Sequence, residues 1–155
     1  MHAARPTRPD GTTPRRAGPG ARLVAALVAL GCLTVLAVAA WLVPAAAGHG
    51  THTSIGLPPC SWAVWFGKPC LTCGMTTAFA HAGEGRWDAA LVVQPAGAAL
   101  ALATATAFWF AAHAALTGSR IGPMIAPLLR PRAVTVGVGA LLAAWVYKIL
   151  TWNGF

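Results

Sequence analysis

Three of the four cysteines in this chain lie in one short stretch, at Cys60, Cys70 and Cys73. Thiols this close can form a disulfide, bind a soft metal ion or exchange disulfides. The Cys-x-x-Cys spacing of the last two suits all three chemistries. These cysteines are therefore the candidate site, and the pattern alone does not choose among the three chemistries.

Imidazole side chains could complete a metal site built on these thiols. Zn²⁺ prefers four tetrahedral ligands, and three thiolates with one imidazole make a closed, structural site. The candidates for the fourth ligand are His49 and His52, in a turn-rich segment before the cysteines, and His81 after them. Each is a weak candidate, because a His-Gly-Thr-His segment is more often solvated and a histidine ending a helix more often only meets the helix C-terminus.

A disulfide is the first structural alternative. An oxidising compartment acts on any pair of thiols within reach, and closing the loop of about ten residues between Cys60 and Cys70 would contribute about 2–3 kcal/mol. One thiol is then left over, which keeps metal binding and thiol–disulfide exchange by Cys70 and Cys73 open. No thioredoxin-like βαβ pattern is present, and Gly74 stands where c-type haem attachment requires a histidine. We expect a structural cluster, disulfide or metal, more than an enzyme.

The composition places these cysteines on a scaffold of membrane helices. Of the 155 residues 57% are hydrophobic and only 9% are charged, far from the balance of a soluble domain. Three apolar runs are long enough to cross a bilayer, at about 23–43, 91–116 and 133–152. We expect an all-α integral membrane protein with three transmembrane helices and a short interfacial helix after the cysteine-rich loop.

The positive charge predicts how these helices are oriented. The net charge is +8, and most basic residues precede the first apolar run or lie between the last two: Arg5, Arg8, Arg15, Arg16, Arg22, Arg120, Arg130 and Arg132. Basic residues that flank spans follow the positive-inside rule, so we expect a membrane protein that does not bind nucleic acid. The N-terminus is then cytoplasmic and the cysteine loop lies outside the cytoplasm.

Two regions are expected along the chain. Residues 1–21, rich in Pro, Gly and Arg, form a disordered basic cytoplasmic tail, and residues 22–155 form one helical membrane domain. The small residues Ala45, Ala46 and Ala47 resemble a signal-peptide cleavage site. We expect the first span to stay attached, because its apolar run exceeds the usual ~7–15 residues of a signal peptide.

Three patterns within the helices bear on the site and on partners. Residues 73–82 suit a short helix, on which Cys73, Thr77 and His81 would share one face. On the second span small residues recur every fourth position, so another span, a membrane partner or a second copy can approach closely there; these residues are Gly97, Ala101 and Ala105. Lys148, in the third span, is expected to extend to the lipid headgroups.

The segment from residue 57 onward also carries a recognisable set of residues. They are Cys60, Gly67, Pro69, Cys70, Cys73, Gly74, Met75, Thr76, Ala78, Gly85, Gln94, Pro95, Trp145, Tyr147 and Lys148. With them the chain resembles a family of bacterial membrane proteins, the domain-of-unknown-function family numbered 2752, whose core is Cys-Pro-x-Cys-Gly. It departs from that pattern at Ser61 and Leu71, which replace prolines, and at Thr77, where an arginine is common in the family.

The resemblance implies a small helical membrane protein and names no activity. A structural cysteine cluster is the first interpretation of its role. A thiol–disulfide or metal-handling protein that uses Cys70 and Cys73 is the second, and a non-catalytic subunit of a membrane complex is the third.

Overall fold

The structure, a computed structural model, describes residues 17–119 and 130–152. Every regular element in these residues is helical, which confirms the predicted all-α class. In chain order the elements are α1 (Pro19–Trp41), η1 (Thr51–Ile55), α2 (Ser61–Phe66), α3 (Met75–Gly83), α4 (Trp87–Val93), α5 (Pro95–Thr117) and α7 (Pro131–Leu150).

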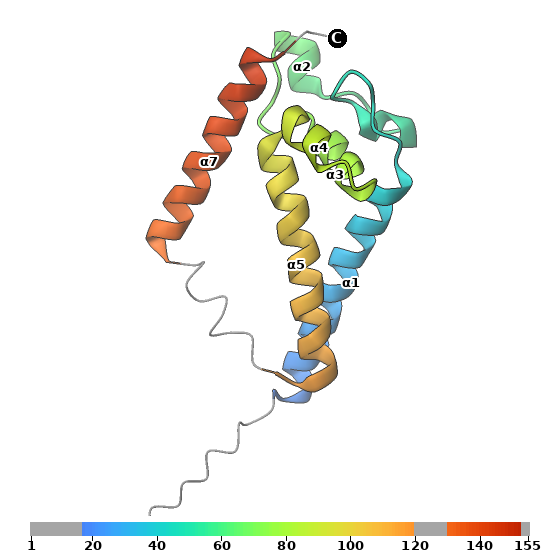
Figure 1. Ribbon diagram of the computed structural model, residues 1–155, viewed down its shortest axis with the longest axis vertical. Coiled ribbons are helices and arrows are strands. Elements are labelled where there is room, and N and C mark those ends of the chain that lie inside the picture. Colours follow the sequence, from blue (N-terminus) through green and yellow to red (C-terminus); the bar gives the residue numbers. More distant parts are fainter. Residues whose placement is uncertain (1–16, 120–129, 153–155) are drawn as a thin grey trace, which may run out of the picture.

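Three of these helices, α1, α5 and α7, are long and apolar enough to cross a membrane, as expected for a multi-pass membrane protein. Helices α1 and α5 lie side by side, and the short elements gather at one end of this pair (Figure 1). We call residues 44–94, which hold the short elements and the three clustered cysteines, the cap. At the other end of the pair, the Ala17 N–H donates to the Gly118 carbonyl over 2.8 Å.

A proline lies in the first turn of each long helix, where its missing N–H removes no helical hydrogen bond. Helix α1 therefore begins at Pro19, so residues 19–21, expected in the disordered tail, are helical; residues 1–16 lie outside the described part. The second span begins at Pro95 and not near residue 91. Gln94 is extended (φ −160°) and separates α4 from α5, as the residue before a proline often does.

The small residues of α5 are used within this chain. A Cβ placed on Gly97 would lie 2.9 Å from the Ala78 Cβ of α3, so only glycine allows this approach. Ala101 and Ala105 border a small cavity between α5, α1 and α3. Gly83 of α3 similarly meets the α1 backbone, which a Cβ would approach to 2.9 Å. The predicted close approach of another span is found, because α1 packs along α5.

Helix α7 is joined to the cap by its last turns and by the residues that directly follow them. Three side chains there donate to cap carbonyls: Trp145 Nε1 to Pro69 (3.1 Å), Tyr147 Oη to Val92 (2.8 Å) and Trp152 Nε1 to Gly67 (3.2 Å). Along the rest of its length α7 diverges from α5 (Figure 1), and an apolar groove of about 880 Å³ lies between them.

Lys148, in the same turns of α7, does not extend to the headgroups. Its side chain is buried, with only 5% of the residue exposed. The ammonium donates to the carbonyls of Gly48 and Val93, each over 3.1 Å. The expectation of a lysine that reaches the membrane surface is wrong, because two cap carbonyls, remote in sequence, receive the charge inside the protein.

Candidate metal centre

The three cysteines of the cap converge. The Sγ atoms of Cys60, Cys70 and Cys73 all lie within 4.8 Å of one another. Four sulfurs around a Zn²⁺ ion at about 2.3 Å would be about 3.8 Å apart, so a small contraction fits this triangle to a metal ion. All four cysteines are free thiols, and the fourth, Cys32, belongs to α1, away from this group.

Short turns bring the cysteines together. Cys60 directly precedes α2, and Gly67 ends that helix in a left-handed conformation (φ +61°), which turns the chain back toward it. The Cys73 N–H then donates to the Cys70 carbonyl over 3.1 Å in the turn before α3. Gly74 follows in a left-handed conformation (φ +85°), directly before α3. The sequential spacing of 60, 70 and 73 thereby becomes one cluster.

Two of the three candidate histidines border the same site. A cavity of about 330 Å³ is lined by the three cysteines together with His49 and His52. The His52 Nε2 atom lies 3.2 Å from the Pro58 carbonyl oxygen, and the His49 ring stacks on Trp152 with 4.5 Å between centroids. Within the described residues, the tight group of ligand atoms contains the three thiols and neither imidazole.

The third candidate, His81, is not brought to the thiols. It is buried on α3, with its Nδ1 atom 4.0 Å from the Glu84 carboxylate, and it does not line the cavity. The predicted common face of Cys73, Thr77 and His81 is wrong, because Cys73 lies before the helix, which begins at Met75. The left-handed Gly74 changes the chain direction between them.

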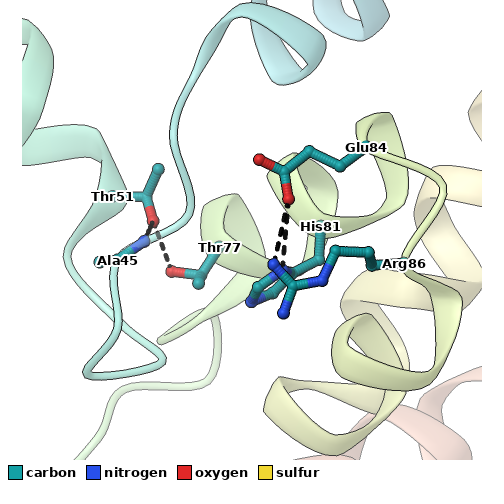
Figure 2. A network of polar contacts seen from close by, with 6 residues as sticks. All are labelled: Ala45, Thr51, Thr77, His81, Glu84 and Arg86. Atoms are coloured by element: carbon teal, nitrogen blue, oxygen red, sulfur yellow. Dashed lines mark hydrogen bonds and ion pairs between the residues drawn. The ribbon is translucent and has the colours of Figure 1, made fainter.

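A pair of buried threonines connects the histidine segment to α3, and sequence reasoning missed it. The Oγ1 atoms of Thr51 and Thr77 lie 2.8 Å apart, and Thr51 Oγ1 also accepts from the Ala45 N–H over 3.0 Å, as Figure 2 shows. Thr77 is one of the three positions at which the sequence departs from the family pattern that it resembles. The sequence marks Thr77 as unusual only through this departure. It does not indicate that Thr77 pairs with Thr51, which is 26 residues away.

Burial and hydrogen bonding make the thiols of the Cys-x-x-Cys pair unequal. Burial raises the pKa of Cys73 to about 12. Burial also acts to raise the pKa of Cys70, but hydrogen bonds from the Thr72 hydroxyl, the Cys60 thiol and the Thr72 backbone outweigh it and lower that pKa below its ordinary value. Cys70 Sγ lies 3.4 Å from Thr72 Oγ1. Without metal, Cys70 therefore loses its proton at a lower pH than Cys73.

Alkylation of the reduced, metal-free protein should therefore modify Cys70 before Cys73. Only the thiolate reacts, so we expect Cys73 to be slower by at least about tenfold at pH 8. Raising the pH should accelerate Cys70 first, since Cys73 stays protonated until the pH approaches about 12. Timed iodoacetamide labelling with peptide mass spectrometry measures both rates, and a faster Cys73 would contradict the assignment.

The comparisons with known proteins agree with the resemblance seen in the sequence. Residues 60–109 match the family model described as "Protein of unknown function (DUF2752)". This match begins at the first clustered cysteine and extends through α3 and α4 into α5. No curated protein and no solved structure matches the chain.

Proposed function

We propose that this protein is a multi-pass membrane protein whose cap binds a soft divalent metal ion, Zn²⁺ by preference, through Cys60, Cys70 and Cys73. The observation that carries the proposal is the triangle of three free thiols within 4.8 Å. A disulfide would join one pair at about 2 Å and leave the third thiol aside. Thiolate ligands in a nearly tetrahedral arrangement suit Zn²⁺.

We expect the fourth ligand to be one of the two histidines that line the cavity. His49 and His52 line it with the thiols, so a rotation of either side chain could bring an imidazole to the ion. A site with three thiolates and one imidazole has no open position, and such closed sites are structural. The metal would then hold α2 and the turn before α3 together.

Metal binding at this site exchanges protons for the ion. Three neutral thiols and one divalent ion give a metal trithiolate with one net negative charge and release three protons. The proton on Cys73 is the hardest to remove, since its pKa is raised to about 12. Affinity should therefore rise with pH across the range in which the thiols stay protonated.

We also propose that the cap faces outside the cytoplasm. The basic residues Arg22, Arg130 and Arg132 belong to the ends of α1 and α7 that are remote from the cap, and Arg22 donates to the last carbonyls of α5 (2.9 and 3.1 Å). Basic residues favour the cytoplasmic side. In intact cells treated with a membrane-impermeant reductant and a membrane-impermeant chelator, a membrane-impermeant thiol reagent should label the cap cysteines. If the cysteines were labelled only after lysis, the cap would face the cytoplasm and the proposed orientation would be wrong.

A second candidate function is thiol–disulfide exchange by Cys70 and Cys73. It is favoured by the lowered pKa of Cys70, since a readily formed thiolate is the attacking group in such exchange. In that case the pair would cycle between dithiol and disulfide, with two electrons and two protons passing to or from a second dithiol or disulfide.

Metal analysis combined with thiol counting separates these functions. The full chain, purified in mild detergent without chelator, should contain about one zinc ion per chain, and reductant should release no additional thiols. A chelator should expose the three cap thiols to alkylation. A pair of thiols gained only on reduction, with no zinc, would overturn the metal centre and support the disulfide. Three freely alkylated thiols with no metal would exclude both the metal centre and a structural disulfide, and would favour the thiol–disulfide exchange function.

A further inference from the structure

Lys148 is a buried cation beside the thiol cluster. Only 5% of the residue is exposed, and its ammonium donates to two carbonyls, those of Gly48 and Val93. Within residues 17–119 and 130–152, the ion pairs involve Glu84, and none reaches Lys148. A buried charge with two neutral acceptors and no anion is costly, so this position calls for a negative partner.

The thiol cluster is in the right place to be that partner. A Cβ placed on Gly74, the residue after Cys73, would lie 3.2 Å from the Lys148 Nζ atom. The ammonium is thus packed against the turn that carries Cys73. Its acceptor Gly48 directly precedes His49, which also lines the cavity. Lys148 therefore contacts two of the segments that line the proposed metal site, at Gly48 and at Gly74.

The net charge of the metal-loaded site matches that of one ammonium group. Three thiolates with a divalent ion carry one net negative charge, and a neutral imidazole leaves it unchanged. One ammonium cancels it. With a monovalent ion such as Cu⁺ the same ligands carry two negative charges, and one lysine cancels only half. The buried cation therefore matches a divalent ion better than a monovalent one.

We infer that Lys148 is the counter-ion of the cap metal centre, contacting two of the segments that line the site and favouring a divalent over a monovalent soft ion. This inference rests on the proposed function. It gives α7 a role at the metal site that the cysteine spacing alone does not predict. Partners of this kind around metal ligands typically change affinity by about 10–100-fold when they are replaced.

The test uses Cd²⁺ as a probe, because thiolate-to-cadmium absorption reports binding directly. Lys148→Gln keeps a side-chain amide that can donate to the carbonyls but removes the charge. Tyr147→Phe is the matched control. It removes a neighbouring hydrogen bond between α7 and the cap, the 2.8 Å bond from Tyr147 to Val92, and keeps the charge of Lys148. We expect Lys148→Gln to weaken Cd²⁺ binding by at least about tenfold and to reduce the preference for Cd²⁺ over Cu⁺, with Tyr147→Phe within about threefold of the unsubstituted protein.

The outcomes separate the inference from the proposed function. If the unsubstituted chain binds no Cd²⁺, the metal centre itself fails. If it binds one ion per chain and Lys148→Gln binds equally well, the counter-ion role is overturned and the centre stands. If Lys148→Gln and Tyr147→Phe lost equal Cd²⁺ affinity, Lys148 would act only by holding α7 against the cap, and its role as counter-ion would be overturned. Should Lys148→Gln not fold, Lys148→Arg decides: retained affinity and ion preference support the charge, and a tenfold loss overturns it.

Discussion

Replacing Cys73 with serine should abolish metal binding. Cys73 is the most buried of the three cap cysteines, at 7% exposed, and its Sγ atom lies within 4.8 Å of both others. A serine hydroxyl stays protonated and is a poor ligand for a soft ion, so the site would keep two thiolates. We expect the zinc content to fall from about one ion per chain to less than about a tenth of that.

Cys32→Ser is the matched control for this prediction. It removes one thiol from the same chain, but from α1, outside the cluster. Metal content should not change in this variant. Metal analysis of both proteins, purified side by side, measures the effect, and full zinc content in Cys73→Ser would contradict the assignment of this thiol as a ligand.

Gly74→Ala should produce the largest structural effect at the site. Its left-handed backbone (φ +85°) costs any residue with a Cβ about 1–2 kcal/mol. The Cβ would also lie 2.9 Å from the Gly48 carbonyl oxygen and 3.2 Å from the Lys148 Nζ atom. Separating these groups should cost about 1–3 kcal/mol more and displace Cys73, so both stability and Cd²⁺ affinity should fall.

Gly56→Ala isolates the backbone part of this effect. Gly56 has nearly the same conformation (φ +81°), but a Cβ there would meet nothing within 4 Å. Thermal unfolding in detergent should therefore show a smaller loss for Gly56→Ala, and its Cd²⁺ titration should match that of the unsubstituted chain. Equal losses in the two variants would show that the contact with Gly48 and Lys148 contributes nothing.

The long helices were predictable because their signal is local. Apolar runs of sufficient length identify α1, α5 and α7 without any knowledge of tertiary contacts. The predicted start of the second span, near residue 91, is wrong for a local reason. The apolar residues before Gln94 belong to α4, and the backbone becomes extended at Gln94, directly before Pro95.

The site was predictable only in part. The three cysteines are close in sequence, so their convergence could be expected, and two of three candidate histidines do border the cavity. His81 was misplaced because a single left-handed residue, Gly74, breaks the helical spacing assumed from Cys73. The bond from Lys148 to Gly48 spans 100 residues, and no periodicity or motif records such a contact.

X-ray absorption at the zinc edge, on the unsubstituted chain purified in detergent without added metal, tests the metal centre most directly. The proposed site predicts a shell of three sulfur atoms at about 2.3 Å and one nitrogen at about 2.0–2.1 Å. A zinc ion with only nitrogen and oxygen neighbours, or a zinc-free protein in which two of the three cap cysteines form a reducible pair, would contradict it.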